Sequence, residues 1–134
     1  MISILNKDFA SSSLFILRIW LGCMMMYHSY WAFTEGIDGF AGYLGDKLGF
    51  PAPVLFAYLA KGSEFFGGLL LVLGLLVRLS AALIALTMAV AVFIAHGDHI
   101  IGEGELALNY LTLAIVIFWD NPLRFSLSML MKKG

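Results

Sequence analysis

Four long apolar stretches, separated by polar or glycine-rich connections, dominate the pattern of the chain. They run over about residues 14–33, 54–77, 80–96 and 105–119. As a helix, the first stretch is about 30 Å long, which matches the hydrocarbon core of a bilayer. The fourth is short for a membrane span, so either its flanks extend it or it is buried among the other three. The pattern predicts an all-α, integral membrane four-helix bundle that forms one domain over residues 1–134.

The connections between these stretches predict further local structure. The first, over residues 34–53, is rich in glycine. Four large side chains recur in it at helical spacing: Phe40, Tyr43, Leu44 and Leu48. They predict a short helix that lies in the membrane interface within the first outer loop. The second connection is expected to be a tight turn around Arg78, with Ser80 as the N-cap of the third helix.

Basic residues are distributed unequally between the two predicted sides of the membrane. Five fall on the side that holds both termini: Lys7, Arg78, Arg124, Lys132 and Lys133. Outside the predicted spans, the other side holds Lys47 and most of the acidic residues. Because cytoplasmic segments carry an excess of Lys and Arg, both termini are predicted to be cytoplasmic.

Composition strengthens the membrane interpretation. Of the 134 residues, 61% are hydrophobic and 13% are charged, whereas a soluble domain has about 25% charged residues. A soluble globule of this size could not bury so much apolar surface, and disorder needs the opposite composition. The net charge of −1 gives no basic excess for binding nucleic acid. Cys23 is the single cysteine, so the chain has no dithiol and no Cys-based zinc motif.

Polar side chains from all four predicted helices fall at one depth, in the outer half of the predicted membrane. They are His28, Lys61, Glu64, His96, Glu105 and Asn109. A charged group inside a span costs about 2.5–3.5 kcal/mol on insertion, so it needs a partner or a water-filled cavity. Glu64, near the middle of the second helix, is the deepest of them. The sequence therefore predicts a shared polar pocket.

A purely structural network would also satisfy these residues. Lys61 and Glu64 are three residues apart on one helix and can neutralise each other. Arg18 either extends to the cytoplasmic headgroups or pairs with Glu64. His96 and Glu105 can be ordinary interface residues. The residues alone leave open whether the pocket holds a ligand.

The predicted pocket suits a quinone better than a metal. A quinone needs an apolar slot, with polar groups that hydrogen-bond and exchange protons at its carbonyl oxygens. Residues of suitable type and depth are His28, Tyr58, Lys61, Glu64 and His96. Haem between His28 and His96 is a weaker interpretation, because two histidines at similar depth are a weak signal. No metal site is predicted, since no thiolate cluster accompanies the histidines.

A series of motifs extends through nearly the whole chain. They are Tyr27-His28 after Arg18, LGFPAP from Leu48, LAKGSEFFGGLLLVLGLLVRLSA from Leu59, GEGEL from Gly102 and NPLRFSL from Asn121. With these motifs the chain resembles the DoxX family of small bacterial four-helix membrane proteins. The resemblance implies a bacterial inner-membrane location. It also implies characteristic residues at Arg18, His28, Glu64, Arg78 and His96. Ser29 and Ala32 depart from the family pattern, which often has Gly and Lys there.

The resemblance also implies a function. The DoxX family takes its name from a subunit of a thiosulfate:quinone oxidoreductase, so we expect a membrane subunit of a redox complex with a quinone cofactor. A protein partner would carry the redox centre. Whether the chain also forms a homo-oligomer is left open. Glu64 and His28 would handle protons. The expected ligand contacts are Arg18, Tyr58, Lys61, His96, Glu105 and Asn109. The alternative is a non-catalytic membrane scaffold or assembly partner, and a transporter fits less well without an internal repeat.

Overall fold

The fold was analysed in a computed structural model of the chain. The structure describes residues 2–95, 97, 100–102, 104–120 and 130–131, with only the backbone for residues 2–11. Within these residues all regular structure is helical, as the sequence predicts. In chain order the elements are α1 (Ile2–Glu35), α2 (Ile37–Gly42), the π-helical η1 (Tyr43–Lys47), α3 (Pro53–Leu73), α4 (Val77–Val90), the π-helical η2 (Ala91–Ala95) and α5 (Glu105–Asp120).

The turn between α3 and α4 lies earlier than predicted. Gly74 ends α3 with a left-handed backbone (φ 72°), and Leu76 is also left-handed (φ 46°). The amide of Leu75 donates to the Leu70 carbonyl at 2.9 Å, which closes a helix C-terminus of the Schellman type. Glycine adopts the left-handed conformation without a steric penalty, so the chain turns at Gly74. The expectation of a turn around Arg78 with Ser80 as N-cap is therefore wrong, because both residues lie inside α4.

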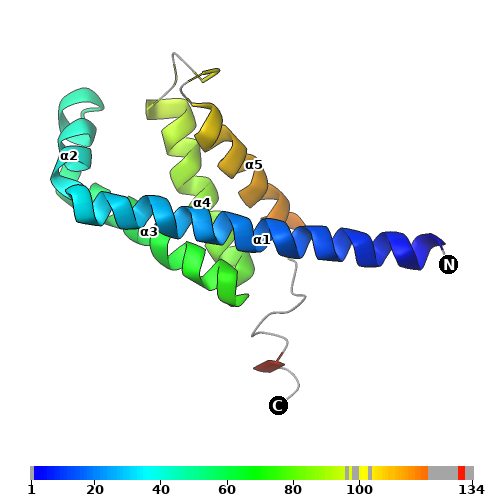
Figure 1. Cartoon of the computed structure of the whole chain (residues 1–134). Coiled ribbons are helices and arrows are strands. Elements are labelled where there is room, and N and C mark those ends of the chain that lie inside the picture. The colour runs from blue at the N-terminus through cyan, green and yellow to red at the C-terminus, as the bar shows by residue number, and fades with distance from the viewer. Residues whose placement is uncertain (1, 96, 98–99, 103, 121–129, 132–134) are drawn as a thin grey trace.

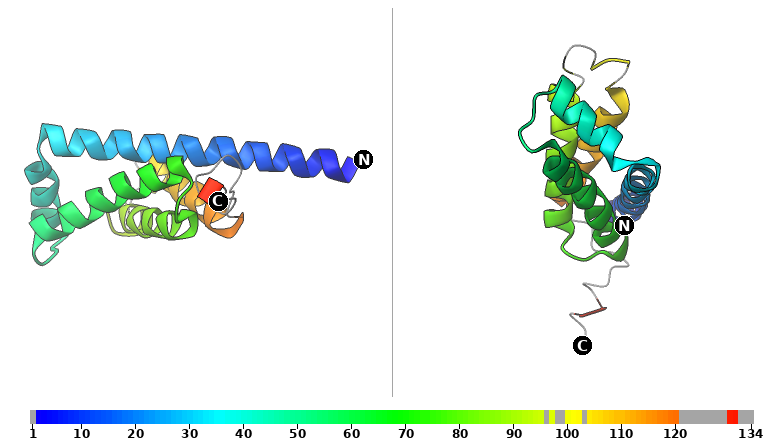
Figure 2. Two further views of the ribbon diagram at one scale, coloured as in Figure 1. Left: turned by 90° about the horizontal axis from the view of Figure 1, so that it is seen from below. Right: turned by 90° about the vertical axis from the view of Figure 1, so that its left-hand side faces the viewer.

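Other boundaries also differ from the prediction. α1 begins well before the predicted residue 14, and its N-terminal part extends past the other helices (Figures 1 and 2). The short helix expected in the first connection is present as α2, and η1 continues it. Pro53 is the first residue of α3, where its missing N–H has no helical partner to lose. The predicted third helix is α4 continued by η2, and His96 lies outside the described residues.

The helices pack as two layers that meet at the turn between α3 and α4 (Figures 1 and 2). α1 packs along α3, α4 packs against α5, and α3 contacts α4. The α1–α3 contact depends on two glycines. A Cβ added at Gly22 would lie 2.6 Å from the Gly68 carbonyl oxygen, and a Cβ added at Gly68 would lie 2.6 Å from that of Gly22. Small residues of this kind let membrane helices approach closely.

Buried apolar side chains form two separate clusters. The larger joins α1, α3, α4 and α5 and includes Leu21, Met25, Leu71 and Ile84. The smaller joins α2 and η1 to α3 and consists of Ile37, Ala41, Leu44 and Ala57. The segment 37–48, which we call the cover, is thus attached to the start of α3 by a cluster of its own. Glycines with positive φ stand on both sides of it, Gly36 at 121° and Gly49 at 69°.

The outer surface is strongly apolar. Many large hydrophobic side chains on it are exposed, among them Trp20, Phe66, Leu86, Phe93 and Trp119. Among the described residues, Pro53–Leu73 and Val77–Ala95 are long and apolar enough to cross a membrane. Crossing by the other two predicted spans stays a prediction.

Candidate functional site

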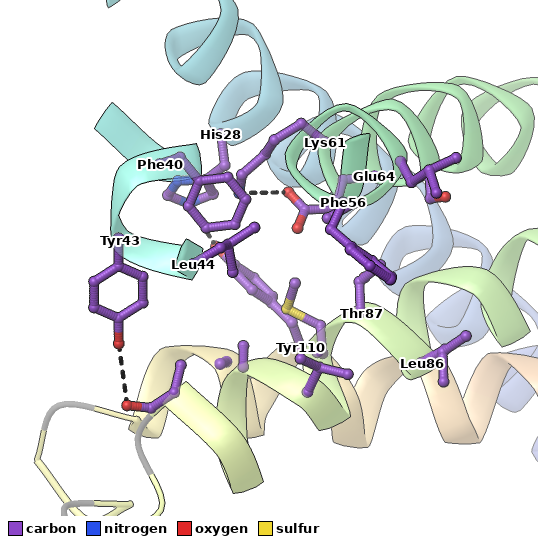
Figure 3. A pocket seen from close by; sticks show the side chains of 18 of the residues that line it. His28, Phe40, Tyr43, Leu44, Phe56, Lys61, Glu64, Leu86, Thr87 and Tyr110 are labelled. Atoms are coloured by element: carbon purple, nitrogen blue, oxygen red, sulfur yellow. Dashed lines mark hydrogen bonds and ion pairs between the residues drawn. The ribbon is translucent and has the colours of Figure 1, made fainter. Parts of the chain in front are cut away.

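A cavity of about 470 Å³ lies between the helices and beneath the cover (Figure 3). Its walls come from α1, α3, α4, η2 and α5, and the cover closes one side. Most of the lining is apolar, from side chains such as Phe40, Leu44, Phe56 and Met88. The polar lining residues are His28, Tyr43, Lys61, Ser63, Glu64, Thr87 and Tyr110. The cavity is therefore an apolar space with a few convergent polar groups, which is the usual form of a small-molecule site.

Glu64 presents a buried carboxylate to this cavity. Its side chain is 5% exposed, and its Oε2 lies 3.0 Å from Lys61 Nζ. Ser29 Oγ lies 3.5 Å from the same oxygen but only 2.6 Å from the Met25 carbonyl oxygen. Because a hydroxyl has one hydrogen to donate, the shorter bond to Met25 takes it. Lys61 is thus the strong partner of Glu64.

Lys61 connects this carboxylate to the cover. Its Nζ lies 4.8 Å from the centroid of the Phe40 ring, within the range of a cation–π contact. An ammonium group has three N–H donors. One of these N–H donors is directed to Glu64, and one side of the ammonium group faces the Phe40 ring. At least one N–H donor is then left for a ligand in the cavity.

His28 and Tyr110 form a second polar pair on the cavity wall. His28 Nε2 lies 3.3 Å from the Tyr110 hydroxyl, and the two rings meet edge-on with centroids 5.8 Å apart. The imidazole nitrogen either donates a hydrogen bond to the phenolic oxygen or accepts one from the phenolic hydroxyl, according to the tautomer of His28. Tyr110 is buried on α5, whereas His28 comes from α1. The pair therefore joins α1 to α5 at the cavity.

The cover is also bonded to the far wall. The Tyr43 hydroxyl, in η1, donates to the Ala95 carbonyl oxygen, in η2, at 3.2 Å (Figure 3). Both partners lie in π-helical segments, which occur frequently at functional sites. This bond closes the cavity on the side of the first connection.

The structure brings three of the predicted site residues together. His28, Lys61 and Glu64 line one cavity although they come from α1 and α3. His96 is outside the described residues. The other predicted residues, Arg18, Tyr58, Glu105 and Asn109, do not line this cavity.

Arg18 is buried elsewhere on α1. Its side chain is fully buried, and its guanidinium carbon lies 5.3 Å from the centroid of the Phe15 ring. It precedes Ser29, the neighbour of Glu64, by eleven residues, which is about 16 Å of helix. Neither expectation for Arg18 holds: it does not extend to the surface, and it is too far from Glu64 to pair with it.

Tyr58 and the start of α5 face outward. Tyr58 is 51% exposed and lies against Phe33, with ring centroids 6.2 Å apart. Glu105 and Asn109 are exposed, and Glu105 Oε1 accepts a hydrogen bond from the Gly102 amide at 3.1 Å. Glu105 thus orders the entry into α5 instead of facing the cavity.

The polar lining residues that the sequence does not predict are Tyr43, Ser63, Thr87 and Tyr110. Of these, Tyr110 makes the contact with His28. It shares a buried face of α5 with Leu111, Ala114 and Ile117, a spacing typical of the inward side of a helix. This apolar stripe is the sequence signal for the inward face of α5. The polar residues Glu105 and Asn109 indicate a different, outward face.

The described residues offer no cluster of three or more His, Cys, Asp or Glu side chains that could hold a metal ion. A haem ligand pair of His28 and His96 stays untested, since His96 is outside the described residues. The cavity can hold an amphiphile: its apolar walls suit a ring or chain, and its two polar pairs can hydrogen-bond a head group and exchange protons with it.

Comparisons with known proteins give one match. A family model described as DoxX matches residues 13–97. No curated protein and no solved structure matches the chain. The matched segment includes His28, Lys61 and Glu64, whereas Tyr110 lies beyond it.

Proposed function

The chain belongs to the DoxX family, a membrane protein family often associated with redox reactions, and from this we propose that it is a membrane subunit of a redox complex. In this proposal the cavity binds a quinone or a similar amphiphile. A protein partner carries the redox centre that supplies or accepts the electrons.

The proposal places the helices in a bacterial inner membrane. α1, α3, α4 and α5 cross it, both termini are cytoplasmic, and the cover lies at the outer interface. Two apolar segments of sufficient length and the many exposed large hydrophobic side chains support this placement. The excess of basic residues on the side of the termini supports the orientation.

The observation that carries the proposal is a carboxylate–ammonium pair on the wall of an apolar cavity. Glu64 lies near the middle of α3, about 16 Å from the start of that helix. Ionisable residues at such depth are rare and mark functional sites. An ion pair with only a structural role needs no cavity beside it, but here Glu64 and Lys61 both line one of about 470 Å³.

The polar groups suit the two ends of a quinone ring. A bound quinone supplies reversible two-electron, two-proton chemistry. The Lys61 ammonium would donate a hydrogen bond to one carbonyl oxygen, and the His28–Tyr110 pair would donate to the other. Glu64 would exchange a proton with the head group from beside Lys61, and His28 would do so from beside Tyr110. Thr87 would act as an acceptor only, since its hydroxyl donates to the Ile84 carbonyl at 2.9 Å.

Binding of a short-chain quinone to the purified protein in detergent tests the proposal. Glu64→Gln and His28→Ala should each weaken binding at least tenfold. Glu105→Gln is the matched control for Glu64→Gln, because Glu105 is exposed and outside the cavity. If Glu64→Gln and His28→Ala both bind the quinone as the parent protein does, the proposal is wrong.

The scaffold function is the second candidate, and one observation favours it. Lys61 Nζ and Glu64 Oε2 lie 3.0 Å apart, so each neutralises the charge of the other. If the pair is only structural, Glu64→Gln should lower the melting temperature in detergent, and no quinone should shift the melting temperature of the parent protein.

A further inference from the structure

We infer that the ligand of this cavity carries a long apolar chain and that it enters sideways from the bilayer, between α3 and α4. The entrance is formed by Phe56, Leu59 and Leu86, which we call the lateral portal. This inference rests on the proposed function, because it concerns the same cavity.

The portal residues belong to the cavity and to the outer surface at once. Each lines the cavity, and Leu59 and Leu86 are also 55% and 63% exposed. Phe56 is 38% exposed. A side chain that both lines a cavity and faces outward lies at its rim. Phe56, Leu86 and Thr87 lie on the side of the cavity away from Tyr43 and the bond that closes the cover (Figure 3).

The helix geometry explains why the wall opens here. α3 and α4 approach closely near their connecting turn, where a Cβ on Gly67 would lie 3.3 Å from the Ile84 side chain. From that point the two helices diverge toward the cover (Figure 1). Phe56 and Leu59 lie in the first two turns of α3, away from this contact, and both line the cavity there.

The α4 side of the portal lies at the depth of the hydrocarbon, whereas Phe56 and Leu59 are about 5 and 9 Å from the start of α3. Leu86 is the midpoint of the 19-residue apolar segment Val77–Ala95, about 13 Å from either end. An opening at that level meets lipid chains and not water. Its rim is made of large apolar side chains, which a hydrocarbon chain can pass without loss of hydrogen bonds.

The water-facing side offers a poorer route. There the cover lies over the cavity, with Phe40 held by Lys61 and Tyr43 bonded to Ala95. Leu106 is another exposed lining residue, but it stands in the first turn of α5 beside the exposed Glu105. A gap at that position would have the Glu105 carboxylate beside it, whereas the three residues of the lateral portal are all apolar.

Cavity size also favours a chain that extends outside. At about 470 Å³ the cavity falls within the range of roughly 300–1,000 Å³ that holds drug-sized ligands. A substituted ring and the start of a chain would fill it. The rest of a long chain would pass through the portal into the bilayer.

Two probes and four tryptophan variants test the inference. The probes are a benzoquinone that bears only small substituents and the same ring with a decyl chain. Leu86→Trp narrows the portal, and Leu79→Trp is the control. Leu79 is seven residues earlier on the same helix face, 54% exposed and outside the cavity. Leu59→Trp narrows the portal from α3, so the test does not depend on one variant folding.

The decyl probe should lose at least tenfold more affinity than the short probe in Leu86→Trp and in Leu59→Trp. Leu79→Trp should not distinguish the probes. Equal losses for both probes, or none, would overturn the portal while the proposed function stands. If Leu106→Trp, and not the two portal variants, weakens the decyl probe more than the short probe, the entrance lies at α5 and the lateral portal is also overturned. If the parent protein binds neither probe, the proposed function fails as well.

Discussion

The close contact between α1 and α3 makes Gly22→Ala a strict test of the fold. A methyl group at Gly22 would lie 2.6 Å from the Gly68 carbonyl oxygen and 2.7 Å from Val72 Cγ2. The side chain of Val72 can rotate, but the Gly68 carbonyl belongs to the helix backbone. The helices must therefore separate by several tenths of an ångström, and overpacking of this kind costs about 1–3 kcal/mol. We expect a value near the upper end, because backbone must move.

Gly62→Ala is the matched control for this substitution. Gly62 lies inside a helix as Gly22 does, in α3 instead of α1, but a Cβ added there has no neighbour within 4 Å. Alanine in a helix is favoured over glycine by about 1 kcal/mol, so this variant should be as stable as the parent protein or more stable.

Thermal unfolding in detergent, followed by circular dichroism, measures both glycine variants. Gly22→Ala should melt several degrees below the parent protein, and Gly62→Ala should not. Equal melting temperatures for the two variants would refute the close approach of α1 and α3 in this structure.

Three further substitutions probe the polar contacts. Lys61→Met leaves the buried Glu64 carboxylate without its cation and should destabilise the fold by about 3–5 kcal/mol. Adding Glu64→Gln to that variant should restore part of the melting temperature, and no restoration would mean that the charges are not coupled. Tyr110→Phe removes the partner of His28 and should cost about 1 kcal/mol in thermal unfolding, whereas an unchanged melting temperature would argue against this bond. Tyr43→Phe removes the bond between η1 and η2, so amide hydrogen exchange should become faster in the cover, and unchanged exchange would contradict a closing role for that bond.

The sequence is informative about the ionisable part of the site for a simple reason. His28, Lys61 and Glu64 interrupt long apolar stretches, and such residues are too costly to face lipid. Helical periodicity then places them on inward faces, and the structure brings all three to one cavity. The apolar stretch over about residues 105–119 also predicts a helix, and α5 extends over Glu105–Asp120.

Other features could not be derived from the pattern. In a soluble helix the polar face meets water, but in a membrane helix both the lipid side and the core side are apolar. Because both sides of α5 are apolar, its polar residues Glu105 and Asn109 were the guide to its inward face. They lie where the helix begins, and polar residues at a helix end can face the interface instead of the core. The signal for Tyr110 is the apolar stripe that it shares with Leu111, Ala114 and Ile117, and such a stripe alone does not tell whether it faces the core or the lipid. The turn at Gly74 was hidden by apolar residues on both sides of it.

The separate apolar cluster that attaches the cover to α3 has a consequence for local stability. Ile37, Ala41 and Leu44 pack on Ala57, apart from the larger cluster that joins the long helices. Substitutions in this small anchor should loosen the cover while the long helices keep their own packing. The tightness of the cover and the stability of the four long helices can then be altered separately.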